Sequence, residues 1–170
     1  MCGIVGYIGT KRAQDFVVDG LEKLEYRGYD SAGIAVNNGG PQFSITKKEG
    51  RLQRLADELT KNPLEGTIGI GHTRWATHGG PSDTNSHPHF NKDKSIVVVH
   101  NGIIENYLEL KKDLISKGYE FLSETDTEVI AHLLDYNFKG DILKAVQETL
   151  KSPRGAYALG VMSTKDPDRI

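Results

Sequence analysis

The chain begins with residues 1–10, MCGIVGYIGT, and its only cysteine is Cys2. The apolar run after this cysteine is short and ends in glycine, which predicts a buried strand. A chain end frays unless something holds it, so position 2 suits a core residue poorly. It suits a nucleophile, because removal of Met1 would leave the α-amine of Cys2 beside its own thiol. An amine with a pKa near ~7.7–8.0 can accept the thiol proton. The alternative, a small buried hydrophobe at the start of a strand, remains open at this point.

Composition narrows the class of protein. The chain has 170 residues, of which 37% are hydrophobic and 26% charged, as expected for one soluble globular domain. The net charge of −2 favours neither a nucleic acid nor an anionic membrane as partner. The sequence contains neither a ~18–20-residue apolar span nor a secretory signal. A single cysteine cannot form an internal disulfide, which favours a reducing cytoplasm.

The order of expected elements favours an α+β fold. Antiparallel or mixed sheets with helices packed outside them are expected, because strands and helices are mixed and several strands resemble hairpin partners. The expected strands cover residues 2–9, 31–39, 41–50, 66–76, 94–100, 119–123 and 155–163. The expected helices cover residues 11–26, 51–62, 106–118, 125–137 and 141–151. Asn106 is expected to cap the third helix, and Thr125 with Glu128 forms a T-x-x-E capping box for the fourth.

Two segments at strand ends carry candidate polar groups. In GHTRWATHGG, Arg74 offers a planar fork that fits a carboxylate, and a surface arginine beside a core Trp75 is the alternative. In VVVHNGIIEN, the pair Asn101-Gly102 is typical of a tight hairpin turn. A helix signal follows instead of a matching strand, so an amide side chain and a glycine N–H could form an oxyanion hole.

The segment SETDTEV places Asp126 at an expected helix start, where the helix dipole alone favours an acid. The functional alternative is that Asp126 binds a ligand ammonium. Taken together, the segments supply a thiol nucleophile, an amine base, an oxyanion hole, a carboxylate clamp and an ammonium clamp. These groups suit an amide attached to an α-amino acid, which means glutamine or asparagine.

Five segments carry a family resemblance: CGIVGYIG, EYRGYDSAGIAV, GHTRWATHG, VVVHNGIIENY and SETDTEVIAHL. They resemble the N-terminal glutaminase domains of the glutamine–fructose-6-phosphate aminotransferase family, a branch of the class II glutamine amidotransferases. The resemblance spans essentially the whole chain. It implies an N-terminal-nucleophile hydrolase fold, a four-layer α/β/β/α sandwich of antiparallel sheets. Residues 1–170 would then be one glutaminase domain, incomplete at its C-terminus and lacking the isomerase half.

The resemblance also implies roles for individual residues. Cys2 is expected as the nucleophile that hydrolyses L-glutamine to glutamate and ammonia through a thioester. Asn101 and Gly102 are expected to form the oxyanion hole. Arg74 is expected to bind the α-carboxylate of glutamine, with Thr77 and His78 beside it, and Asp126 is expected to bind the α-ammonium. Trp75 is expected to gate the passage of ammonia, and Arg27 to support the Cys2 loop.

The same resemblance implies the partners of a full-length enzyme. The ammonia would pass to fructose 6-phosphate in the isomerase half and yield glucosamine 6-phosphate for amino-sugar synthesis. The resemblance implies no cofactor and no metal, a homo-oligomeric full-length enzyme, and a cytoplasmic location.

Three alternatives compete with this interpretation. A metal site is suggested by His72, His78, His87 and His89, although their spacing matches no established Cys/His or HExxH pattern. A nucleotide-binding module is weaker, because GIVGYIG is not a G-x-G-x-x-G sequence. An inactive binding domain is the third, and a glutamine hydrolysis assay distinguishes it from an enzyme.

Overall fold

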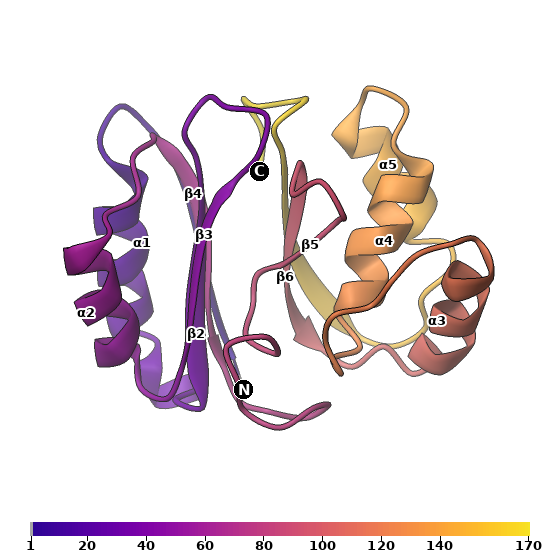
Figure 1. Ribbon diagram of the computed structural model, residues 1–170, viewed down its shortest axis with the longest axis horizontal. Helices are drawn as coiled ribbons and strands as arrows, with labels where there is room; N and C mark the ends of the chain where they lie inside the picture. Colours follow the sequence, from indigo (N-terminus) through magenta and orange to yellow (C-terminus); the bar gives the residue numbers. More distant parts are fainter. Residues whose placement is uncertain (1) are drawn as a thin grey trace.

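Two antiparallel sheets face each other between two layers of helices (Figure 1) in a computed structural model that describes residues 2–170. The strands are β1 (Gly3–Ile8), β2 (Ser31–Asn37), β3 (Ser44–Glu49), β4 (Ile68–Arg74), β5 (His89–Phe90), β6 (Ile96–Gly102) and β7 (Tyr157–Ser163). The helices are α1 (Ala13–Glu22), α2 (Leu52–Lys61), α3 (Tyr107–Ser116), α4 (Glu128–Asn137) and α5 (Ile142–Thr149), with a short 3₁₀ helix at Glu25–Arg27. The predicted α+β class with helices outside antiparallel sheets is confirmed.

The sheet order brings distant segments together. One sheet has the order β1-β4-β2-β3, and the other has the order β5-β6-β7. In the first sheet β1 pairs with β4 so that Gly3 lies opposite Thr73, which places the start of the chain beside the end of β4. In the second sheet Asn101 lies opposite Ala158. Helices α1 and α2 cover the first sheet, and α3, α4 and α5 cover the second (Figure 1).

Strand β6 shows why an uninterrupted apolar run forms a strand here. Ile96 and Val98 pack against the helices of the second layer, whereas Val97 and Val99 pack against the first sheet. Successive side chains of a strand point to opposite faces, so both faces of β6 are buried. Burial of each such side chain contributes about 1.5–3 kcal/mol, which holds the two sheets and the outer helices together.

Helix α1 packs against the first sheet through apolar residues four positions apart. Val17 and Leu21 are fully buried between α1 and the first sheet. Phe16, next to Val17 in the chain, is 42% exposed and stacks on Tyr7 with ring centroids 4.4 Å apart. Leu24 lies beyond the end of the helix, because α1 ends at Glu22.

The prediction of a strand over residues 119–123 is wrong. This segment is irregular, and its alternating aromatic residues Tyr119 and Phe121 pack against Leu114, Val129 and Leu133 of α3 and α4. A strand of two residues, β5, forms instead within the polar loop after β4 and pairs with β6.

The predicted capping box of the fourth helix is wrong, whereas the predicted cap residue of the third helix is correct in position but makes no side-chain cap bond. Helix α4 begins at Glu128, and the hydroxyl of Thr125 bonds to Ser123 Oγ and His89 Nε2, each at 3.0 Å. Asn106 occupies the N-cap position of α3, but its side chain bonds to the backbone of residues 152 and 154. These polar groups stabilise loop-to-loop contacts instead of helix ends.

Among residues 2–170, no helix is both long and apolar enough to span a membrane.

Candidate active site

A cavity of about 480 Å³ opens where β4, β6 and the segment before α4 meet. Of the predicted site residues, all but His78 line it. The lining residues are Cys2, Arg27, Arg74, Trp75, Thr77, His87, His100, Asn101, Gly102, Ile103, Thr125, Asp126, Thr127, Tyr157 and Ala158. The structure therefore brings together candidates that are up to 124 positions apart between Cys2 and Asp126.

Cys2 is held at the wall of this cavity by the β1–β4 pairing. The Trp75 backbone N–H donates to Cys2 Sγ at 3.1 Å, and the Gly3 N–H donates to Thr73 Oγ1 at 3.2 Å. A Cβ on Gly3 would lie only 2.7 Å from Leu24 Cβ, so the residue after the cysteine has room only for glycine. The predicted removal of Met1 lies outside the described residues and stays a prediction.

Asn101 and Gly102 do not form a hairpin turn, because both belong to β6 and pair with β7. Asn101 Nδ2 donates to the Cys2 carbonyl at 2.9 Å, which leaves its second hydrogen for another acceptor. Gly102 has a φ of +127°, and a Cβ there would lie 2.3 Å from the Ala156 carbonyl oxygen. Only glycine fits that position. The geometry is compatible with the predicted oxyanion hole beside the Cys2 sulfur.

The Arg74 guanidinium is buried and faces the turn that follows β4. It donates to the carbonyls of His78, of Gly79 at 2.9 Å and of Gly80 at 3.5 Å. Burial lowers the pKa of Arg74, whereas the nearby Cys2 and Asp126 act in the opposite direction. Three of its five N–H donors are engaged in this way, which leaves two for other acceptors.

Asp126 is 4% exposed and lies across the cavity wall from β4. Its Oδ2 accepts the Ile104 backbone N–H at 2.9 Å and lies 4.0 Å from His78 Nδ1. A carboxylate has about four acceptor positions, so Asp126 retains capacity for a ligand ammonium. The His78 ring packs edge-on against Tyr107, with centroids 4.9 Å apart. The His78 ring therefore lies beside the Asp126 carboxylate, and the backbone carbonyl of His78, not its ring, contacts Arg74.

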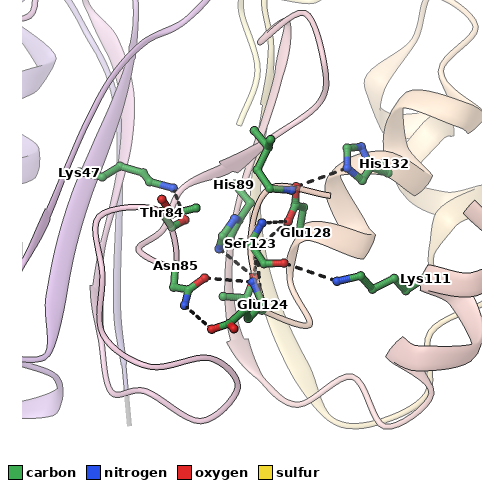
Figure 2. Close-up of polar contacts among 11 residues, drawn as sticks. Lys47, Thr84, Asn85, His89, Lys111, Ser123, Glu124, Glu128 and His132 are labelled. Carbon is green, nitrogen blue, oxygen red and sulfur yellow. Dashed lines mark hydrogen bonds and ion pairs between the residues drawn. The ribbon is translucent and has the colours of Figure 1, made fainter. Parts of the chain in front are cut away.

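The segment before Asp126 is fixed by a network of buried hydrogen bonds (Figure 2). The Glu128 carboxylate accepts the backbone N–H groups of Leu122 at 2.8 Å and Ser123 at 2.7 Å. The Asn85 amide bonds to both the backbone N–H and the carboxylate of Glu124. Burial raises the pKa of Glu128, but His132, whose Nε2 lies 3.6 Å from Glu128 Oε1, and the hydrogen bonds from Leu122 and Ser123 outweigh it and lower that pKa to about 2. The ionised Glu128 thus orders the backbone that presents Asp126.

Three other predicted residues lie at the rim of the cavity. Trp75 is 46% exposed and packs edge-on against Tyr29, with ring centroids 5.5 Å apart. Arg27 donates from Nε to Tyr26 Oη at 3.0 Å, and this contact does not involve the Cys2 loop. Thr77 is exposed. The roles expected of Trp75, Arg27 and Thr77 stay predictions.

Sequence reasoning missed several residues that shape the site. Asp30 accepts the Ala76 N–H at 2.8 Å and donates its own N–H to the Arg74 carbonyl at 3.1 Å, so it fixes the turn after β4. His100 lines the cavity and bonds through Nδ1 to Thr127 Oγ1 at 2.8 Å. Asp30 lies within the segment EYRGYDSAGIAV, and its place in that segment was the only feature of the sequence that pointed to a role in the site.

Three of the histidines considered as metal ligands, His72, His87 and His89, form a buried cluster of rings in contact. The ring centroids of His72 and His87 lie 4.1 Å apart, and those of His87 and His89 lie 4.8 Å apart. Burial lowers the pKa of His72 to about 3 and holds the pKa values of His87 and His89 well below the ordinary range. Within residues 2–170, no group of three His, Cys, Asp or Glu side chains is placed to hold a metal ion.

The sequence matches known proteins along its whole length. The glutamine–fructose-6-phosphate aminotransferases (isomerizing) of Clostridium acetobutylicum and Thermus thermophilus are 59% and 56% identical to it. The match covers all of this chain and 28% of each relative, so the chain spans less than a third of their length. Among solved structures, the glutamine phosphoribosylpyrophosphate amidotransferase of Bacillus subtilis has a TM-score of 0.82 and 28% identity, covering 96% of this chain and 35% of that one.

A second solved structure, described as the allosteric regulatory enzyme of purine biosynthesis, has a TM-score of 0.84 and 29% identity over 96% of this chain and 36% of that one. These neighbours confirm the expected N-terminal-nucleophile hydrolase fold, with two antiparallel sheets between helical layers. Residues 72–170 match the family model described as a glutamine amidotransferase domain. The full-length match to the aminotransferases, the shared fold and this family match agree, and the chain belongs to the glutamine amidotransferase domain family.

Proposed function

We propose that this chain hydrolyses the side-chain amide of L-glutamine to glutamate and ammonia through a thioester on Cys2. The observation that carries the proposal is the bond of 2.9 Å between Asn101 Nδ2 and the Cys2 carbonyl, which fixes an amide donor beside the only thiol. Arg74 and Asp126 line the same cavity. Nucleophile, oxyanion donor and two opposite charges are thus available within one cavity of about 480 Å³.

The reaction has two displacements at the same carbon. The Cys2 sulfur attacks the amide carbon of glutamine, and the carbonyl oxygen becomes an oxyanion that Asn101 Nδ2 and Gly102 stabilise. The C–N bond then breaks, the nitrogen takes up a proton and leaves as ammonia, and a thioester remains. Water attacks the thioester, the C–S bond breaks, and glutamate leaves with the thiol restored. After removal of Met1, the Cys2 α-amine takes the thiol proton and returns it to the leaving nitrogen.

The head group of glutamine is selected by charge. Arg74 takes the α-carboxylate and Asp126 the α-ammonium, with Thr77 beside the former and His78 behind the latter. Charge-assisted hydrogen bonds of this kind contribute about 1.5–3 kcal/mol each. An amide without a zwitterionic head group would therefore bind poorly.

We propose further that the ammonia serves the reaction named for the relatives. In that reaction fructose 6-phosphate, held by an isomerase half, receives the nitrogen and yields glucosamine 6-phosphate for amino-sugar synthesis. Trp75, half-exposed at the rim beside Cys2, would gate the passage of ammonia. A homo-oligomeric full-length protein in the cytoplasm, where the Cys2 thiol stays reduced, completes the proposal.

The test measures glutamate release by the purified chain, with intact-mass spectrometry to establish whether Met1 is present. Cys2→Ala should abolish release without changing the far-UV circular dichroism spectrum, whereas Thr60→Ala on the outer face of α2 should be as active as the parent. Hydroxylamine should intercept the thioester and give the γ-hydroxamate of glutamate. Undiminished release by Cys2→Ala, or none by a parent that lacks Met1, would refute the proposal.

A further inference from the structure

His72 lies in the middle of the site's polar framework without lining the cavity. It belongs to β4, its side chain is fully buried, and it points toward the second sheet. Its Nε2 lies 2.9 Å from Asn101 Oδ1 and 3.0 Å from the His100 carbonyl oxygen. Both partners can only accept hydrogen bonds. Nε2 therefore carries the proton and donates to both.

The orientation of the Asn101 amide follows from this tautomer. Its Oδ1 accepts from His72 Nε2, and its Nδ2 donates to the Cys2 carbonyl at 2.9 Å. The opposite orientation would set Oδ1 against the Cys2 carbonyl oxygen and Nδ2 against the Nε2–H group. Each of those contacts is repulsive. The two ends of the amide are thus fixed by two independent partners, His72 on β4 and the Cys2 carbonyl directly before β1.

We propose that His72 is a positioning residue of the glutaminase reaction, whose Nε2–H group holds the Asn101 amide with Nδ2 facing Cys2. The inference rests on the proposed function, in which Nδ2 stabilises the oxyanion. Asparagine χ2 is intrinsically broad, so an unheld amide would populate orientations that turn its oxygen toward the developing negative charge. Holding the donor before the reaction is what makes an oxyanion hole effective.

The surroundings keep His72 in the required form. Burial lowers its pKa to about 3, so the ring stays neutral at physiological pH. The ring packs against that of His87 at a tilt of 33°, and His87 Nδ1 accepts the His100 backbone N–H at 3.3 Å. These contacts hold the plane of the His72 ring and the backbone of β6 in one arrangement.

The test compares His72→Leu, His72→Gln and Ile34→Ala in steady-state glutamine hydrolysis. Leucine removes the donor, glutamine can place an N–H group near Nε2, and Ile34→Ala makes a buried cavity on the neighbouring strand, facing the α1–α2 layer. We expect His72→Leu to lower kcat about 10–100-fold, less than the ~10²–10³ lost when an oxyanion-hole donor is deleted. KM for glutamine should stay within about twofold, and His72→Gln should recover most of kcat. Ile34→Ala should lower only the melting temperature.

A transition-state probe separates positioning from packing. An aldehyde analogue of glutamate forms a hemithioacetal with Cys2, whose oxygen occupies the oxyanion position, whereas glutamate itself does not test that position. His72→Leu should weaken inhibition by the aldehyde by the same factor as kcat and leave inhibition by glutamate unchanged. Parental kcat and aldehyde affinity in His72→Leu, equal losses in Ile34→Ala, or no recovery in His72→Gln would each overturn the positioning role. A parent without glutamate release would instead overturn the proposed function.

Discussion

Acidification should destabilise this fold well before its carboxylates are protonated. His72, His87 and His89 are buried, and burial lowers the pKa of each below the ordinary value of ~6.5. Between the folded and unfolded pKa values, the unfolded chain binds more protons than the folded one. Stability is therefore complete above about pH 6.5 and decreases as the pH falls below it.

As long as the buried rings stay neutral in the folded protein, the loss of stability on acidification equals the free energy that protonation gives the unfolded chain. At about pH 5, protonation stabilises a free imidazole with a pKa of ~6.5 by ~2 kcal/mol, because one pKa unit corresponds to ~1.36 kcal/mol. Three such rings give ~6 kcal/mol if their effects add. That is comparable to the whole free energy of unfolding of a typical domain, ~5–15 kcal/mol.

The assay is urea unfolding followed by far-UV circular dichroism at about pH 7.5, 6.5, 5.5 and 5, values that bracket the ordinary imidazole pKa of ~6.5. His72→Gln should lose ~2 kcal/mol less than the parent across this range, because one titrating ring is gone. Ile34→Ala should have a lower unfolding free energy than the parent at every pH, but its unfolding free energy should change with pH as steeply as that of the parent. A parent whose unfolding free energy varies by less than ~1 kcal/mol, or a His72→Gln variant with the parental slope, would refute the reasoning.

Three further outcomes are expected from the site. Arg74→Ala and Asp126→Ala should each raise KM for glutamine about 10–150-fold, and glutaramide should be a poor substrate for the parent; unchanged KM values would contradict the head-group assignment. Glu128→Ala leaves the N–H groups of Leu122 and Ser123 without their acceptor. It should therefore lower the unfolding free energy in urea by ~2–4 kcal/mol and raise KM for glutamine. The control Glu109→Ala on α3 should change neither quantity. Gly102→Ala should cost at least ~1–3 kcal/mol and most of kcat, because φ is +127° there and the Ala156 carbonyl leaves no room; a stable and active variant would be evidence against the strand-end geometry.

The regular elements were predictable where local pattern and burial agree. The strands expected over residues 31–39, 41–50 and 94–100 are confirmed as β2, β3 and β6, and the first two pair with each other. Residues 119–123 were misjudged because Tyr119 and Phe121 alternate as in a strand but pack against two helices. The cap of α4 was misplaced because Thr125 bonds to His89, which lies 36 positions earlier in the chain.

The site was predictable in its parts but not in its connections. Cys2, Arg74, Asn101 and Asp126 could be proposed from residue type and position, and the structure brings them to one cavity. The contact between His72 and Asn101 could not be proposed, because it depends on how two separate sheets stack. In the sequence, His72 was noticed only as one of several histidines in a possible metal site.

Strand alternation explains how a buried core leads directly into a catalytic cavity. On β4 the residues Ile70, His72 and Arg74 share one face, and on β6 Val97, Val99 and Asn101 share the face that meets it. Ile70, Val97 and Val99 form the core between the sheets, so they set the separation at which His72 reaches Asn101.

One step further along each strand, the same facing positions hold Arg74 and Asn101, the residues proposed as substrate clamp and oxyanion donor. Arg74 and Asn101 both line the cavity, and each continues a face that is apolar and fully packed behind it. A close-packed core transmits strain instead of absorbing it. The separation between Arg74 and Asn101, the two groups proposed to bind the head group of glutamine and to stabilise its oxyanion, is therefore set by buried side chains of the core.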